Sequence, residues 1–261
     1  MIPRISLAAV LSLVRTACAA APASPPVVST APPATLEAGM VSAADPRAAQ
    51  AGVDILRQGG SATDAAIAVM LALTVVEPQS SGIGGGGFYV RGAPDGTVET
   101  LDGRETAPAA ATPRWFLDAD GKPIPFKQAV GSGLSIGVPG NLALAAQAHR
   151  RHGNLAWAKL FEPAIRLARQ GWTLSNRGRD FLVRNKALAA RSKAGAALFY
   201  DARDEPLAAG TLLTNPALAQ TFERIAKGGA RAFYEGEAGS QLAEIVAFDT
   251  PASNGMTPRD V

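Results

Sequence analysis

The side chains that most often carry acid–base, metal or nucleophilic chemistry are scarce in this chain. Its 261 residues include two histidines, His149 and His152, and one cysteine, Cys18. The histidines lie three residues apart at the end of an expected helix, with no nearby carboxylate placed as a third metal ligand. They suit the negative end of a helix dipole better than a metal ion. The two histidines are the only bases of their kind in the sequence, and a Ser-His-Asp hydrolase triad finds no support. We expect no metal and no cofactor.

A run of glycines from Gly82 to Gly87 satisfies the Gly-x-Gly-x-x-Gly pattern, and Glu105 follows near the spacing of a ribose-binding carboxylate. A dinucleotide site, however, needs a strand before the glycines and a helix after them. Here a helix is expected before the run and a strand after it. The glycines therefore indicate a close approach of the backbone to another backbone or to a substrate.

Arg104 has two possible roles when it is judged by its chemistry alone. A planar guanidinium can pair with a carboxylate ligand through two parallel hydrogen bonds, whereas a lysine offers only a point charge. Arg104 also lies beside Asp102 and Glu105, and a structural ion pair with one of them is the alternative. Position alone favours the structural pair.

Two helices and a hairpin must position these residues. Asp45 can cap, and Pro46 can open, a first helix that ends at Gly59-Gly60. Ser61 to Asp64 forms a capping box for a second helix, which is apolar at nearly every position from Ala65 to Val76. A β-hairpin is expected after the glycine run, with strands at 88–90 and 98–101 around the turn sequence Ala-Pro-Asp-Gly at 93–96.

The rest of the chain is expected to be mainly helical. The predicted helices cover residues 141–151, 155–170 with a break at Pro163, 181–191, 216–227 and 238–246. At the end of the chain, Thr257-Pro258-Arg259-Asp260 has the pattern of a helix N-terminus. Because only Val261 follows, we expect the sequence to stop inside a larger fold.

Residues 1–20 read as a secretory signal peptide, with Arg4, an apolar run and then small residues. Residues 21–36 read as a flexible Pro/Ala-rich spacer. We therefore expect a periplasmic or secreted protein, with a disordered N-terminal tail as the alternative. The apolar run is too short for a membrane anchor. Cys18 belongs to the leader, which leaves no thiol nucleophile in the mature chain. The formal charge is +3 with basic and acidic residues interspersed, so no nucleic-acid partner is expected.

Three stretches together resemble the γ-glutamyltransferase family, also called glutathione hydrolases. They are 40–66 with the motif Gly-Val-Asp-Ile-Leu-Arg-Gln-Gly-Gly at 52–60, 84–88, and Asp-Gly-Arg-Glu-Thr-Ala-Pro at 102–108. Further matches follow in the family's order at 139–140, 163–171, Phe-Tyr-Glu-Gly at 233–236, and 256–257. The resemblance covers nearly everything after the leader.

The resemblance implies an α/β fold, the αββα sandwich of the N-terminal-nucleophile hydrolases, formed by two subunits that arise when one precursor cleaves itself. It implies that a new N-terminal threonine attacks the γ-glutamyl amide of glutathione or a related compound, with its own amine as the base. In such an enzyme Arg104 holds the α-carboxylate of the γ-glutamyl group, Glu105 orients it, and the glycine run supports packing.

The chain departs from complete members of that family, whose nucleophile and most substrate contacts lie beyond the position of Val261. No catalytic residue is therefore assigned here. We expect residues 37–261 to be the truncated front portion of the large subunit, inactive alone, with an apolar patch left exposed by the helix at 65–76 and the hairpin. The alternatives are a related cephalosporin or glutaryl-type acylase and a noncatalytic remnant.

Overall fold

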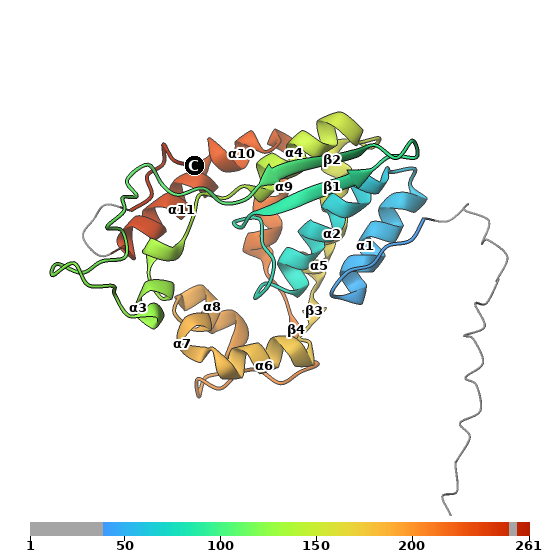
Figure 1. Ribbon diagram of the computed structural model, residues 1–261. Coiled ribbons are helices and arrows are strands. Elements are labelled where there is room, and N and C mark those ends of the chain that lie inside the picture. Colours follow the sequence, from blue (N-terminus) through green and yellow to red (C-terminus); the bar gives the residue numbers. More distant parts are fainter. Residues whose placement is uncertain (1–38, 251–254) are drawn as a thin grey trace, which may run out of the picture. The chain divides into compact units, whose positions relative to one another are not determined.

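The computed structural model describes residues 39–250 and 255–261 (Figure 1). The predicted signal peptide at 1–20, the spacer at 21–36 and the beginning of the 37–261 portion lie outside these residues. Among the described residues no helix is both long enough and apolar enough to cross a membrane.

The first two helices begin at the predicted caps. In α1 (Pro46–Arg57) the Asp45 side chain accepts a hydrogen bond from the Arg47 amide. In α2 (Ala62–Val76) the Ser61 hydroxyl and the Asp64 carboxylate accept hydrogen bonds from each other's backbone amides, which completes the capping box. Asp64 is fully buried, and its carboxylate also accepts hydrogen bonds from the backbone amides of Asn154 and Leu155.

Helix α2 is buried within the chain itself, and the expectation that it contributes to an exposed apolar patch is wrong. It packs against α1, α4 (Asn141–His152), η2 (Trp157–Phe161) and α5 (Glu162–Gln170). Most of its side chains are inaccessible, with Ala68, Leu71 and Ala72 fully buried. A helix that is apolar around its whole circumference needs such neighbours on every side, and the preceding helix together with three distant elements supplies them.

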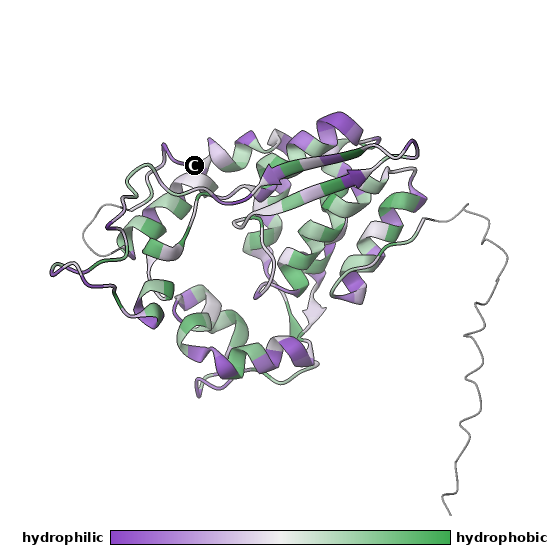
Figure 2. Ribbon diagram, in the orientation of Figure 1, coloured by the Kyte–Doolittle hydropathy of each residue, from purple (hydrophilic) through white to green (hydrophobic). Residues whose placement is uncertain are grey.

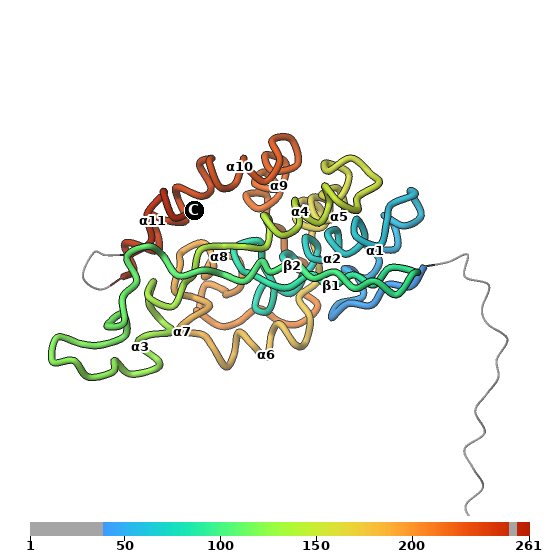
Figure 3. Tube along the Cα trace, turned by 45° about the horizontal axis from the view of Figure 1, so that its top comes forward, coloured from blue at the N-terminus to red at the C-terminus, as the bar shows by residue number. Residues whose placement is uncertain are grey.

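The predicted hairpin forms, with β1 (Gly87–Gly92) paired antiparallel to β2 (Val98–Gly103). Figures 1 and 3 both show the hairpin lying along α4, and Tyr89, Leu101, Leu144 and Ala148 fill the space between them. The opposite face of the hairpin carries Phe88, Val90 and Val98, each about two-thirds exposed (67%, 67% and 66%). This half of the expected exposed patch is therefore present (Figure 2).

The helices of the second half differ in detail from those predicted. The helix expected at 181–191 begins earlier, where Ser175 caps α6 (Asn176–Arg184), and it breaks at Asn185 before α7 (Lys186–Ala189). The break at Pro163 is confirmed as the junction of η2 and α5. Asn215 caps α9 (Pro216–Gly228) as expected, and α11 (Glu237–Phe248) covers the last predicted helix. The remaining elements are α3 (Phe126–Val130), η1 (Gly133–Ser135), α8 (Lys193–Phe199), α10 (Arg231–Tyr234) and the two-residue strands β3 (Trp172–Thr173) and β4 (Leu212–Leu213).

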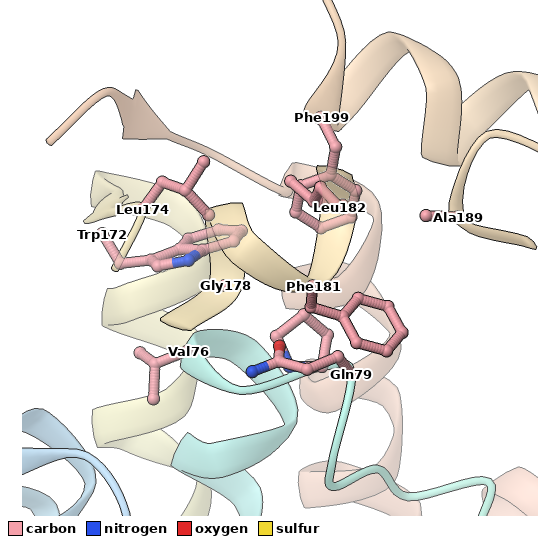
Figure 4. A pocket seen from close by; sticks show the side chains of 10 residues that line it. Val76, Gln79, Trp172, Leu174, Gly178, Phe181, Leu182, Ala189 and Phe199 are labelled. Carbon is pink, nitrogen blue, oxygen red and sulfur yellow. The ribbon is translucent and has the colours of Figure 1, made fainter. Parts of the chain in front are cut away.

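The main core lies between α1, α2, α5 and α9, where an edge-to-face series joins Trp157, Phe161 and Phe222. Where α2 ends, an apolar pocket of about 150 Å³ opens beside α6 and α8 (Figure 4). Trp172, Leu182 and Phe199 are among the side chains around this pocket.

Candidate carboxylate-binding site

Arg104 lies immediately after the end of β2. The Asp102 carboxylate accepts a hydrogen bond from the Arg104 amide at 2.8 Å, which turns the chain away from the hairpin. The guanidinium Nη1 of Arg104 lies 3.3 Å from Glu105 Oε2, so the ion pair with Glu105 exists. The Arg104 side chain nevertheless remains 66% exposed, and it donates no hydrogen bond within the described residues. Most of the guanidinium fork is open to a ligand.

The Glu105 carboxylate is less exposed than the Arg104 guanidinium. The Glu105 side chain is 28% exposed, and its Oε2 atom is buried without a hydrogen-bond partner among the described residues. The carboxylate lies against Gly86, where an added Cβ would be 2.7 Å from Oε2 and 2.5 Å from the Glu105 amide nitrogen. A side chain at position 86 would therefore displace the Arg104-Glu105 segment, because real Cβ atoms do not approach so closely.

The N-terminus of α4 holds the glycine run in place. The carbonyl of Gly85 accepts hydrogen bonds from the amides of Gly140 and Asn141, both at 3.0 Å. The side-chain amide of Asn141 donates to the Gly82 carbonyl at 2.7 Å. An added Cβ at Gly140 would overlap the Gly103 carbonyl. The predicted close approach of backbone to backbone is confirmed, and the end of β2 is enclosed between the glycine run and α4.

A pocket of about 480 Å³ opens beside Arg104 and Glu105. Its walls combine these two charged residues with apolar and aromatic side chains, among them Trp115, Phe116 and Ile136. The Trp115 indole is held by a hydrogen bond from Nε1 to the Leu134 carbonyl at 2.9 Å. A cation beside apolar walls suits a ligand with one anionic end and a less polar remainder.

Beyond Arg104, the chain is tied to the residues near Val261. The Asp260 carboxylate accepts hydrogen bonds from the amide of Ala109 at 2.8 Å and from the amide and hydroxyl of Thr257 at 2.7 Å. The hydrogen bond from the Ala109 amide contributes most to the lowered pKa of Asp260. Residues 258–260 form a turn, and Asp260 accepts a hydrogen bond from the Thr257 amide as the carboxylate of a capping box does.

Each histidine lies near a carboxylate from a distant part of the chain. His149 Nε2 donates to the Leu155 carbonyl at 2.8 Å and lies 3.7 Å from Asp64 Oδ1. His152 Nε2 lies 2.5 Å from Glu99 Oε2. The hydrogen bond with His152 is the largest cause of the lowered pKa of Glu99, and the hydrogen bond with Arg151 is the second. Within 39–250 and 255–261, no three potential metal ligands come together.

Sequence reasoning found Arg104, Glu105 and the glycine run but missed Asn141 and Tyr234. The hydroxyl of Tyr234 donates to the Pro139 carbonyl and accepts from the Ala143 amide, each at 3.0 Å. The only sequence signals were the matched motifs Pro-Gly at 139–140 and Phe-Tyr-Glu-Gly at 233–236. Those motifs gave no indication that the two segments touch.

Two glutathione hydrolase proenzymes are similar in sequence to this chain. The glutathione hydrolase proenzyme of Bacillus subtilis (strain 168) is 39% identical over 226 residues, covering 85% of this chain and 37% of the relative. The Escherichia coli (strain K12) glutathione hydrolase proenzyme is 37% identical over 246 residues, covering 92% and 42%. The chain thus spans roughly two fifths of these curated relatives.

Solved structures agree with the sequence comparisons. The γ-glutamyltranspeptidase of Helicobacter pylori superposes with a TM-score of 0.78 at 33% identity, covering 88% of this chain and 64% of that one. A cephalosporin acylase from Bacillus halodurans gives 0.66 at 27% identity, covering 82% and 39%. These likenesses confirm the N-terminal-nucleophile hydrolase fold class, of which this chain supplies helices and one hairpin. Since the family model described as gamma-glutamyltranspeptidase matches residues 48–254, the chain belongs to the γ-glutamyltranspeptidase family.

Proposed function

We propose that this chain is the large-subunit portion of an enzyme that removes the γ-glutamyl group from glutathione or a similar donor and transfers it to water, amino acids or peptides. In this proposal Arg104 binds the α-carboxylate of the γ-glutamyl group. The observation that carries it is the exposed guanidinium at the wall of the 480 Å³ pocket, held on one side by Glu105.

The two neighbouring residues have different tasks in this proposal. Glu105 orients the guanidinium, because its carboxylate is fixed against Gly86 and reaches Nη1 from the protein side. The remaining N–H groups of Arg104 can then form two parallel, charge-assisted hydrogen bonds with a carboxylate. Such a fork recognises a planar anion with a defined orientation, as selection for an amino-acid-like acyl group requires.

The bond-breaking chemistry is proposed to come from the small subunit of the same precursor. The relatives named as proenzymes support a precursor that is processed. In this scheme the hydroxyl of a threonine freed at the small subunit's N-terminus attacks the amide carbonyl, and the threonine's own amine takes the hydroxyl proton. The amine then gives this proton to the leaving amine as the C–N bond breaks, and water or an acceptor amine cleaves the γ-glutamyl ester that remains. The scheme assigns donor recognition, and no catalytic residue, to the chain described here.

We also propose that the protein is exported to the periplasm or secreted. The charged start, apolar run and small residues within the first 20 positions support this proposal. Cleavage after Ala19 or Ala20 would remove Cys18 together with the leader.

The test is Arg104→Lys in the protein produced from its complete gene. Lysine keeps the charge but loses one of two charge-assisted hydrogen bonds, a change of about 1.5–3 kcal/mol. The donor KM should therefore rise about tenfold or more. Processing into two subunits should continue, because processing involves no donor carboxylate. Arg203→Lys is the matched control, since Arg203 is also exposed and paired with a near neighbour, Asp201.

Two outcomes would contradict the proposal. If Arg104→Lys fails to mature while Arg203→Lys matures, Arg104 is a structural ion-pair residue. If Arg104→Lys matures and keeps the parent KM for a γ-glutamyl anilide, the site does not read the donor carboxylate. Turnover of a glutaryl amide, which keeps the terminal carboxylate but lacks the α-amino group, would then favour the acylase alternative.

A further inference from the structure

The N-terminus of α4 has no cap of its own. Its N-cap residue is Gly140, which has no side chain to accept the unpaired amides of the first turn. Tyr234 of α10 supplies the missing partner, because its hydroxyl accepts a hydrogen bond from the Ala143 amide at 3.0 Å. The same hydroxyl donates to the Pro139 carbonyl at 3.0 Å. One side chain thus fastens both sides of the turn that leads into α4.

The Tyr234 side chain is itself well fixed. Its ring packs edge-to-face on Phe233 with centroids 5.1 Å apart, and Phe233 is buried. Burial raises the pKa of the Tyr234 hydroxyl. The hydroxyl consequently keeps the proton that it donates to Pro139.

The turn held by Tyr234 is the one that grips the glycine run. The backbone amides of Gly140 and Asn141 donate to the Gly85 carbonyl, and the side chain of Asn141, a residue only 9% exposed, donates to the Gly82 carbonyl. The glycine run and Gly140 in turn enclose the end of β2 from two sides. A continuous series of hydrogen bonds and close backbone contacts therefore joins Tyr234 to the segment that carries Arg104.

We infer that Tyr234 is a positioning residue for Arg104: its hydroxyl fixes the start of α4, and α4 fixes the glycine run and the end of β2. Tyr234 lies 130 positions after Arg104 in the sequence and acts only through this series. The effect on substrate rests on the proposed function, whereas the effect on the Arg104 segment does not.

The test compares two tyrosine variants of the protein made from its complete gene. Tyr234→Phe removes the hydroxyl and keeps the ring. Tyr200→Phe is the matched control, because the hydroxyl of Tyr200, the residue after α8, also makes a buried hydrogen bond, to the Leu182 carbonyl of α6 at 3.0 Å. Both variants lose the hydrogen bonds of one tyrosine hydroxyl, so general destabilisation affects both. Only the hydrogen bonds of Tyr234 belong to the series of contacts that leads to Arg104.

Amide hydrogen exchange decides the structural part. We expect exchange in peptides covering 82–87 and 103–106 to be faster in Tyr234→Phe than in the parent and unchanged in Tyr200→Phe. Equal exchange in these peptides for both variants would overturn the inference. Since this readout needs no substrate, it stands even if Arg104→Lys shows that the proposed function is wrong.

Kinetics decide whether the positioning reaches the donor. We expect Tyr234→Phe to raise the donor KM about threefold or more with kcat little changed, and Tyr200→Phe to leave KM unaltered. In an Arg104→Lys background the further effect of Tyr234→Phe should shrink, because residues that act through each other are not additive. A full, additive effect of Tyr234→Phe in that background would overturn the link to Arg104.

Discussion

Gly86 sets how closely the glycine run can approach the segment that carries Arg104. A Cβ at this position would lie 2.6 Å from the Gly103 carbonyl oxygen and 2.5 Å from the Glu105 nitrogen, both backbone atoms that cannot rotate away. Gly84, two residues earlier, is exposed, has no atom within 4 Å of an added Cβ and does not use a positive φ. An added methyl group would therefore collide with backbone at position 86 and meet only open space at position 84.

We predict that Gly86→Ala lowers the free energy of unfolding by about 1–3 kcal/mol, the usual cost of inserting atoms into a packed site. Gly84→Ala should change it by no more than about 0.5 kcal/mol. Urea unfolding of the two variants measures the difference. Equal midpoints would show that the contact at Gly86 relaxes without cost, and the glycine run would lose its role in placing Glu105.

At the residue level, the sequence could predict which residues matter where they form a local pattern. The glycine run and Arg104 each stand in a short motif, and the choice between backbone and dinucleotide contact followed from the order of helix and strand. Asn141 and Tyr234 could not be found in this way, because their partners lie 59 and 91 positions away. The same limit applies to the histidines, whose carboxylates come from β2 and α2.

At the scale of elements, caps and turns were predictable and tertiary contacts were not. Ser61 and Asp64 fix the start of α2 by bonds between neighbours, and Asn215 does the same for α9. Besides α1, the neighbours that bury α2 are α4, η2 and α5, which lie far along the chain, so its apolar surface could not be assigned from the sequence to this chain or to another one. No proline or glycine near Asn185 indicates the break between α6 and α7, so the sequence does not predict it.

The turn at Thr257–Asp260 and the loop at Ala109 form one unit through the Asp260 carboxylate. Hydrogen bonds from Ala109 and Thr257 lower the pKa of Asp260 in the folded protein. A lowered folded-state pKa stabilises the fold above the unfolded-state value of about 3.9, and this contribution is lost as the pH falls through the folded value.

We predict that Asp260→Asn is less stable than the parent at pH 6 and that the difference in free energy of unfolding shrinks as the pH falls below about 4. Asp180→Asn is the control, since Asp180 is exposed on α6 and its carboxylate accepts no hydrogen bond in the described part of the chain. Urea unfolding at several pH values measures both. A difference that stays constant down to pH 3 would mean that the Asp260 carboxylate does not hold the loop.

On the scale of the whole molecule, the hairpin has two different faces. Its inner face packs against other described residues, and its outer face is exposed. Its inner face covers α4, while Phe88, Val90 and Val98 lie on the outer face. Val90 pairs with Thr100, and Val98 pairs with Gly92, so no charged side chain separates the two valines. Grouped apolar side chains on an exposed two-stranded sheet favour association with other surfaces.

We therefore expect the 261-residue chain, produced alone, to associate as its concentration rises. The double variant Val90→Thr, Val98→Thr should weaken this association, because threonine keeps the β-branched shape that suits a strand while adding a hydroxyl that favours water. Val183→Thr is the control: Val183 is 51% exposed on α6, away from the hairpin. Light scattering coupled to size-exclusion chromatography over a range of concentrations measures the mass of each variant. The hairpin is the associating surface if the double variant shifts toward monomer while Val183→Thr behaves as the parent. If the parent is monomeric throughout, or if all three proteins associate equally, the outer face of the hairpin does not drive association.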